Sequence, residues 1–167
     1  MTPLENVPGF EIHPARAADV PVILSFIKKL AAYEKLSHEV TATEERLRES
    51  LFGQRPPAEV AIGYFYGEPV GFVLYFHNYS TFLARPGLYI EDLFVDAAYR
   101  RRGFGRALLL HVARLAGERR CGRLEWAVLD WNEPAINFYK KLGAVAMDEW
   151  TAFRVTGAAL KKLAGLP

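Results

Sequence analysis

Cysteine is almost absent from this chain of 167 residues. Its single cysteine, Cys121, excludes an internal disulfide and gives no basis for a zinc site. We expect Cys121 to be a small strand residue without a catalytic role, and we predict no bound metal.

Long apolar runs and a strong net charge are also missing. No stretch approaches the ~18 uninterrupted apolar residues that cross a membrane, and residues 1–9 lack the pattern of a secretory signal. A net charge of +2 is too small to indicate a nucleic-acid partner. The sequence predicts a cytoplasmic protein that binds neither membrane nor nucleic acid. Residues 1–9 are expected to be a flexible lead-in and residues 10–167 one domain.

Arginines and glycines gather between an expected strand that ends at Val95 and an amphipathic helix that follows Gly103. A turn that leads into a helix presents N–H groups and the positive end of the helix dipole, which suit a phosphate or pyrophosphate. Glycines allow a ligand close to the backbone, and arginines supply forked donors. This turn is therefore a candidate anion site.

Two common phosphate motifs do not fit the turn. A Walker loop needs Gly-Lys-Ser/Thr, but Gly105 is followed by Arg106 and Ala107, so no side chain is placed to hold magnesium. A dinucleotide fingerprint from Gly103 needs a small residue where Leu108 stands. An ordinary glycine turn with solvated arginines remains the structural alternative.

Periodicity and turn residues predict an alternation of strands and helices. We expect strands at 10–13, 59–66, 70–77, 88–95, 123–129 and 150–155, and helices at 17–35, 43–53, 104–117, 132–142 and 158–164. Residues 78–87 are expected to be a loop. A strand, a crossover helix and another strand imply a parallel pair in an otherwise antiparallel sheet.

Two motifs carry a resemblance to a known family. Arg100-Arg101-Arg102-Gly103-Phe104-Gly105 resembles the coenzyme A pyrophosphate loop of GCN5-related N-acetyltransferases, and residues 130–144 are similar to that family's Asn-x-x-Ala-x-x-Phe-Tyr segment. Residues 28–34 and 89–95 look closest to the spermidine/spermine and thialysine acetyltransferase branch. The resemblance implies an α/β (α+β) N-acyltransferase fold with a mixed, mostly antiparallel sheet and flanking helices.

The resemblance also implies a cosubstrate, acetyl-CoA, and the residues that bind it. Backbone N–H groups near Leu93, Phe94 and Val95 would hold the pantetheine and polarise the acetyl carbonyl. Asn132 would bind the pantetheine arm or cap its helix. The expected coenzyme-binding set is Leu93, Phe94, Val95, Arg100, Arg101, Arg102, Gly103, Phe104, Gly105, Arg106, Asn132, Pro134 and Ala135.

Acetyl transfer to an amine requires a base and an acid. An alkyl ammonium has a pKa near ~10, so it must lose a proton before it attacks a thioester. Glu91 is the predicted base, acting directly or through water, whereas Asp92 can share its face only if the strand bulges. Tyr139, which matches the family's general-acid tyrosine, is the predicted donor to the departing thiolate, with a core packing role as its alternative.

The resemblance to the polyamine branch implies that the amine approaches along an acidic path, and Tyr33, Glu34, Glu91 and Asp92, together with Glu149, are expected to supply it. The chain has Tyr79-Ser80-Thr81-Phe82 where the polyamine enzymes carry Tyr-Asp-Pro-Trp, which weakens the case for long polycations. The acceptor expected is the primary amine of a small diamine, polyamine or thialysine-like amino acid. The resemblance further implies a homodimer.

Other functions stay open on the sequence alone. An N-acetyltransferase of this fold can act on a protein lysine or an N-terminus, and an acyl-CoA-binding module would need only the arginine loop. A nucleotide-binding protein is disfavoured because the lysine and the magnesium ligand are missing. Among these functions, the residues favour direct acetyl transfer from acetyl-CoA without an acyl-enzyme intermediate.

Overall fold

The computed structural model describes residues 7–166, and these divide after Leu129 into two compact units, residues 7–129 and 130–166. The first unit contains a five-stranded sheet in the order β1-β2-β3-β4-β5. Its strands are β1 (Phe10–Pro14), β2 (Glu59–Phe65), β3 (Glu68–Ser80), β4 (Arg85–Val95) and β5 (Leu124–Trp126). The first four pair antiparallel, and β5 runs parallel to β4. The predicted mixed sheet with one parallel pair is therefore confirmed.

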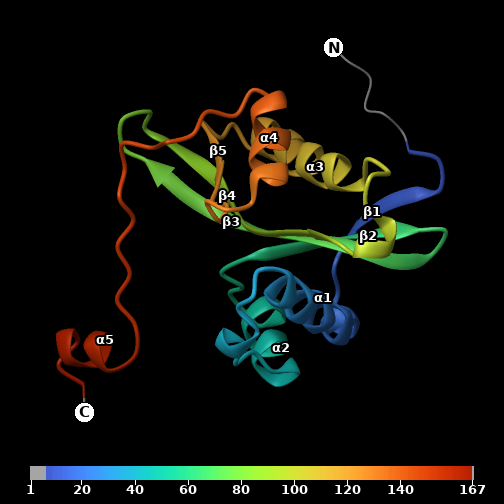
Figure 1. Cartoon of the computed structure of the whole chain (residues 1–167). Coiled ribbons are helices and arrows are strands. Elements are labelled where there is room, and N and C mark those ends of the chain that lie inside the picture. The colour runs from blue at the N-terminus through green and yellow to red at the C-terminus, as the bar shows by residue number, and fades with distance from the viewer. Residues whose placement is uncertain (1–6, 167) are drawn as a thin grey trace. The chain divides into compact units, whose positions relative to one another are not determined.

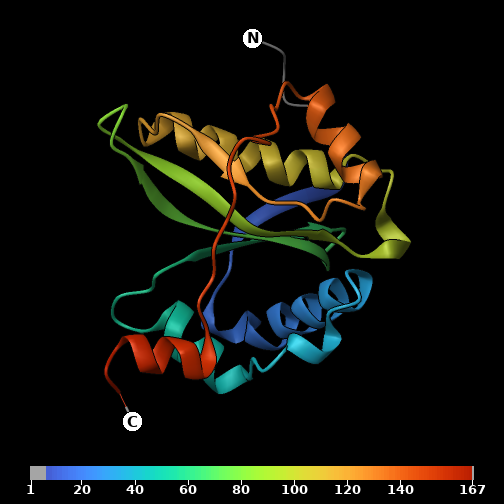
Figure 2. The same ribbon diagram turned by 60° about the vertical axis from the view of Figure 1, so that its left-hand side comes forward.

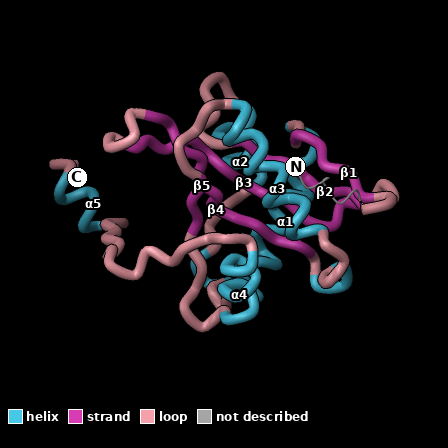
Figure 3. Tube along the Cα trace, turned by 90° about the horizontal axis from the view of Figure 1, so that it is seen from above, coloured by secondary structure: helices cyan, strands magenta, loops and turns pink. Residues whose placement is uncertain are grey.

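Three helices cover the two faces of this sheet. α1 (Val20–Tyr33) and α2 (Glu44–Phe52) lie on one face and α3 (Phe104–Glu118) on the other, in both side views (Figures 1 and 2). Figure 3 gives the view of the same strands and helices from above. Short 3-10 turns η1 (Ala17–Asp19), η2 (Ser37–Glu39) and η3 (Ala97–Tyr99) connect these elements.

Helix starts follow the sequence signals with one exception. Thr43 caps α2 by accepting a hydrogen bond from the Arg46 N–H at 3.2 Å. The exception is the helix expected from residue 17: Asp19 is the N-cap residue of α1, and its carboxylate accepts a hydrogen bond from the Arg16 N–H at 2.7 Å rather than from an N–H of α1. The first turn is consequently the 3-10 turn η1, and α1 starts at Val20.

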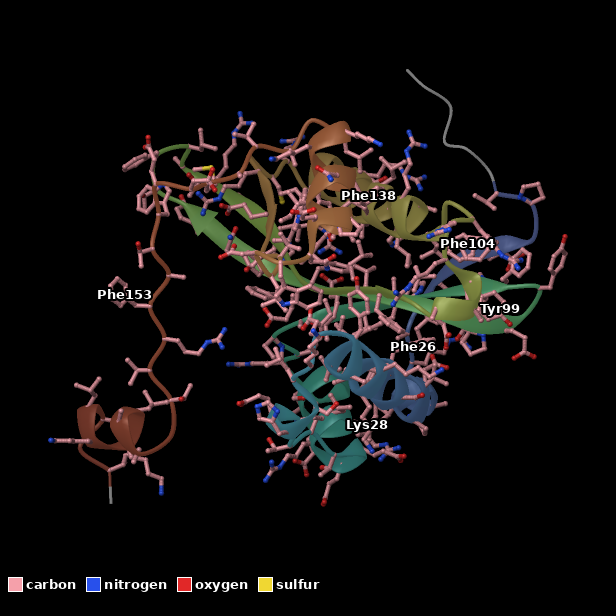
Figure 4. All side chains as sticks on the ribbon, viewed as in Figure 1. Phe26, Lys28, Tyr99, Phe104, Phe138 and Phe153 are labelled. Atoms are coloured by element: carbon pink, nitrogen blue, oxygen red, sulfur yellow. The ribbon has the colours of Figure 1, made fainter. Side chains whose placement is uncertain are left out.

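Aromatic side chains fill both interfaces between helices and sheet. Phe26 of α1 lies 5.6 Å, ring centre to ring centre, from Phe72 of β3. On the opposite face, Phe104 of α3 stacks on Phe10 of β1 at 4.3 Å. Figure 4 labels Phe26 and Phe104 on the two sides of the sheet. Both phenylalanines are at most 3% exposed, so burial of apolar area anchors α1 and α3 to the strands between them.

Two strand predictions in the first unit need correction. Residues 78–87 are not a loop, because Asn78, Tyr79 and Ser80 pair with Gly87, Pro86 and Arg85 and lengthen the β3–β4 hairpin. The expected strand at 123–129 is shorter, since β5 pairs with β4 only over Leu124–Trp126. The predicted lead-in lies mostly outside the described residues, and its described part, residues 7–9, forms a turn whose Gly9 carbonyl accepts from the Tyr66 N–H.

The second unit contains α4 (Glu133–Lys141) and α5 (Gly157–Leu163). The expected strand at 150–155 is wrong, because these residues form no regular structure and pair with no described strand. Gly143 follows α4 with φ 89°, a left-handed conformation that ends the helix as the sequence predicts. Phe153, labelled in Figure 4, is 93% exposed.

Candidate active site

A β-bulge in β4 divides this strand into two parts. Ile90 pairs with Tyr75 of β3 and Asp92 pairs with the adjacent Leu74, so Glu91 is the extra residue without a partner in β3. Tyr75 lies on the α3 face, under the Arg119 guanidinium at 6.0 Å, whereas Leu74 packs into the core on the α1 face. Because paired residues share a face, the bulge turns Asp92 toward the α1 face.

Pairing with β5 stops just before the bulge. β5 pairs with Leu88, Tyr89 and Ile90, and no described strand pairs with the second edge of β4 beyond them. The Asp96 N–H donates to Val70 on the β3 side at 2.8 Å. Since N–H groups alternate along a strand, those of Leu93 and Val95 face the open edge and that of Phe94 faces β3. Two of the three predicted N–H donors are thus directed to the open edge.

The predicted anion loop, residues 100–105, joins η3 to α3. Arg101 has φ 63° and Gly103 has φ 84°, so the backbone takes a left-handed conformation twice before the helix starts. Gly103 is the N-cap of α3 and offers no side-chain cap to its first turn. Phe104 is 1% exposed in the core, which leaves only its backbone for a ligand. This helix start has the arrangement that binds phosphate.

The arginines of the anion loop differ in their surroundings. The Arg100 Nε donates to the Val95 carbonyl at 3.0 Å, and its guanidinium lies 4.5 Å from the centre of the Tyr33 ring. Arg102 lies over Phe65 at 5.5 Å and over Tyr99 at 5.7 Å. Arg101 is exposed and Arg106 is half-buried in the first turn of α3. All three loop arginines are exposed, but Arg100 and Arg102 also contact aromatic rings of the protein.

Three acidic side chains form a carboxylate cluster, Glu34, Glu91 and Asp92, beside the bulge. Glu34 follows the last residue of α1, Glu91 is exposed and Asp92 is half-buried. Burial raises the pKa of Asp92 to about 6, with further contributions from the charges of Glu91 and Glu34. Burial also raises the pKa of Glu34. A partly buried cluster of like charges attracts a cation, and a carboxyl group with a raised pKa can accept a proton near neutral pH.

One contact at this site was missed by the sequence reasoning. The Lys29 ammonium of α1 forms an ion pair with the Asp96 carboxylate, which also accepts from the Ala98 N–H at 3.3 Å and so caps η3. This ion pair and the Arg100–Tyr33 contact fasten α1 to the chain segment that follows β4. No local pattern reveals a pair 67 residues apart in the sequence.

The second unit holds the remaining predicted residues. The Asn132 side chain accepts from the Ala135 N–H at 3.4 Å, so it caps α4, and Pro134 lies in the first turn. Tyr139 is half-buried on the same helix, with its ring 5.3 Å from that of Phe138, which is labelled in Figure 4. The capping role that the sequence left open for Asn132 is thus observed.

Within residues 7–166, no group of three or more His, Cys, Asp or Glu side chains is placed to hold a metal ion, the carboxylate cluster included. Within the same residues, no helix is both long enough and apolar enough to span a bilayer.

Known proteins resemble this chain over most of its length. Residues 27–144 match the Acetyltransferase (GNAT) family, a range that covers parts of both units. A thialysine N-epsilon-acetyltransferase of Mus musculus is 39% identical over 92% of this chain and 96% of its own length. An L-ornithine N5-acetyltransferase of Arabidopsis thaliana is 36% identical over 91% of this chain and 86% of its own length.

Solved structures agree with the sequence comparison. An integron cassette protein from V. cholerae superposes with a TM-score of 0.78 at 27% identity, covering 93% of this chain and 98% of that protein. A metagenomic aminoglycoside acetyltransferase superposes with a TM-score of 0.74 at 20% identity, over 89% and 96% of the two chains, and supports the fold alone. The chain belongs to the GNAT acetyltransferase family and is an N-acetyltransferase, an enzyme that transfers an acetyl group to an amine.

Proposed function

We propose that this enzyme acetylates the side-chain amine of a small diamino acid such as thialysine or ornithine, with acetyl-CoA as donor. The carboxylate cluster beside the open edge of β4 carries this proposal. It offers an ammonium group three acidic side chains at the point where the strand would hold the thioester. Small diamines and polyamines share the same ammonium chemistry and belong to the wider class of acceptors.

The relatives support a diamino acid over a long polyamine. Thialysine and ornithine, named for the two relatives described above, each carry an α-amino acid group and a distal primary amine. A human spermidine/spermine N(1)-acetyltransferase-like protein is less similar, at 30% identity, and this chain spans only 24% of its length. The chain also has Ser80 where the polyamine branch has a carboxylate.

The anion loop and the open strand edge fit acetyl-CoA. The first turn of α3 and the charges of Arg101 and Arg106 suit a pyrophosphate, and the N–H groups of Leu93 and Val95 suit the amides of a pantetheine. The same N–H groups would stabilise negative charge on the acetyl oxygen during attack. Acetyl-CoA would supply the thioester, and the chain supplies its orientation.

A carboxylate at the bulge would remove the proton that the ammonium must lose, and Asp92 takes this role in place of the predicted Glu91. Asp92, with a pKa of about 6, is mostly ionised at neutral pH and still basic enough to accept a proton, directly or through water. Glu91 and Glu34 would hold the ammonium until the transfer occurs. The nitrogen lone pair then forms the N–C bond, and the C–S bond breaks.

Tyr139 would return a proton to the thiolate that leaves. The motif around Tyr139 supports this role. Asn132 caps α4 and so fixes the first turn of the helix that carries Tyr139. Direct transfer needs no nucleophilic cysteine, so Cys121 has no part in this mechanism.

The test is acetyl-CoA-dependent release of free thiol across a panel of amines. The panel contains thialysine, ornithine, lysine, putrescine, spermidine, spermine and a lysine peptide. We expect turnover of a diamino acid at the highest kcat/KM, and a loss of roughly 10²-fold or more in Tyr139→Phe. A preference for the lysine peptide would instead indicate protein acetylation. Coenzyme binding without turnover on any amine would contradict the proposed substrate class.

We also propose a cytoplasmic homodimer in which residues 10–167 act as one domain. The family match from residue 27 to 144 supports a single domain, because it continues across the boundary between the two units. Sedimentation equilibrium of the full chain tests the dimer, which requires about twice the monomer mass of 18.8 kDa.

A further inference from the structure

Arg100 starts the anion loop, but its side chain is directed to α1. Its Nε donates to the Val95 carbonyl at 3.0 Å, and its guanidinium lies 4.5 Å from the centre of the Tyr33 ring and 5.7 Å from that of Phe94. A carbonyl and two aromatic rings thus fix one side chain. A guanidinium held in this way is poorly placed to bind a phosphate in the anion loop.

The partners of Arg100 belong to two different parts of the site. Val95 lies on the open edge of β4, where the coenzyme would bind. Tyr33 is the last residue of α1, and the next residue, Glu34, belongs to the carboxylate cluster and affects the pKa of Asp92. Arg100 is therefore a side chain that connects the open edge of β4 to the end of α1 that would hold the amine.

We propose that Arg100 is a positioning residue that couples coenzyme binding to the placement of the acceptor carboxylates. This inference rests on the proposed function for the identity of the two ligands. A ligand that orders the anion loop and the Val95 backbone holds Arg100 in place, and Arg100 then holds Tyr33 and Glu34. By linkage, an amine bound at Glu34 tightens coenzyme binding by the same factor.

Amide hydrogen exchange at the end of α1 measures this coupling with the coenzyme alone, in the absence of an amine substrate. The N–H groups of Glu34, Lys35 and Leu36 donate to the carbonyls of Leu30, Ala32 and Ala31, so their exchange reports opening of this turn. We expect saturating CoA to slow their exchange roughly three- to tenfold in the wild type, the factor that one cation–π contact is worth. The slowing should largely disappear in Arg100→Gln and in Tyr33→Leu.

Arg102→Gln is the matched control. Arg102 lies in the same loop and also packs on two aromatic rings, Phe65 and Tyr99, but neither ring belongs to α1. This variant should keep the slowing at residues 34–36. Calorimetry with CoA on every variant sets the saturating concentration. Equal slowing in Arg100→Gln and the wild type, or no slowing in the wild type, would overturn the inference.

Steady-state kinetics provide the second readout. Arg100→Gln should raise the KM of the amine several-fold. Arg100→Lys should have the same raised KM, because an ammonium lacks the planar fork of a guanidinium. Arg100→Gln combined with Tyr33→Leu should raise the KM no more than either change alone. An additive double variant would show that Arg100 acts on the coenzyme independently of Tyr33. If the wild type acetylated no amine while CoA still protected residues 34–36, the proposed function would fail and the coupling would stand.

Discussion

The two parts of β4 are neighbours in one strand and have different surroundings. Leu88 and Ile90, before the bulge, are at most 3% exposed and lie between β3 and β5. Leu93 and Val95, after the bulge, pair with β3 on one side and present their N–H groups to an open edge on the other. One extra residue, Glu91, thus separates a segment paired on both sides from a segment with one open edge.

The bulge also changes which charged groups surround Asp92. Without it, Asp92 would share the face of Ile90 and lie away from Glu34. With it, Asp92 lies on the α1 face, where burial and two neighbouring carboxylates raise its pKa to about 6. Such a raised pKa weakens the fold at neutral pH, which is a common cost of a functional site.

The largest effect is expected from neutralising the carboxylates at the bulge. Asp92→Asn removes the proposed base, and Glu91→Gln removes the charge beside it, so kcat/KM with the best amine should fall roughly 10²- to 10⁴-fold in each. Glu68→Gln, at an exposed carboxylate on the first residue of β3, is the matched control and should keep wild-type activity. Full activity of Asp92→Asn would remove Asp92 from the mechanism and leave Glu91 as the base.

A smaller effect is expected where β3 supports the second part of β4. A Cβ at Gly71 would lie 2.5 Å from the Phe94 carbonyl oxygen, so Gly71→Ala must push the two strands apart behind the coenzyme edge. We expect a loss of roughly 1–3 kcal/mol in the free energy of unfolding. Urea denaturation measures it, with Gly117→Ala, where a Cβ has open space, as control. Unchanged stability would show that this strand pair is not tightly packed.

Replacing Asp92 should stabilise the protein while it reduces activity. The folded chain holds the Asp92 proton up to a pH of about 6 and the unfolded chain only to about 3.8, so stability falls as pH rises between these values. Above pH 6 the full cost remains, and Asp92→Asn should therefore gain about 1–3 kcal/mol at pH 7.5. At pH 3 the gain should vanish. A variant less stable than wild type at pH 7.5 would contradict the account of Asp92.

The pH dependence of the rate should follow the same carboxyl group. In the wild type, kcat/KM should decline as pH falls through about 6, because protonated Asp92 cannot accept the proton of the amine. The residual activity of Asp92→Asn should lack this step. A wild-type profile that stays flat between pH 7 and 5 would exclude a base of this pKa.

The smallest effect is expected outside this strand, at Cys121. Cys121→Ala should keep kcat/KM within about twofold, because direct transfer forms no bond to a thiol. Loss of turnover in a folded Cys121→Ala protein would indicate an acyl-enzyme instead. Circular dichroism verifies that the variant is folded.

The sequence predicted several local features of this region, because a helix cap or a turn has a local signal. Thr43 and Asn132 were recognisable as helix caps, and Gly103 as the turn before α3. The adjacent Glu91 and Asp92 raised the question of a bulge, but the choice between a regular and a bulged strand depends on the register with β3. The Lys29–Asp96 and Arg100–Tyr33 contacts join distant segments and have no local signature.

The wrong strand predictions have the same cause: whether a segment forms a strand depends on partner strands that are distant in sequence. Residues 78–87 were expected to be a loop, yet Pro86 and Gly87 lie in β4 because Tyr79 and Asn78 of β3 pair with them. Residues 127–129 have strand-like composition, but β4 bulges at Glu91, where pairing with β5 has already ended. In residues 150–155 the pattern alone favoured a strand that no described segment pairs with.

The most direct test is a crystal structure of the enzyme with CoA. The account predicts that the pantetheine amides bond to the backbone of Leu93 and Val95 on the open edge of β4, and that the pyrophosphate lies against the first turn of α3. It also predicts the thiol next to Asp92. A coenzyme bound elsewhere, with this edge of β4 still unpaired, would contradict the division of the strand at Glu91.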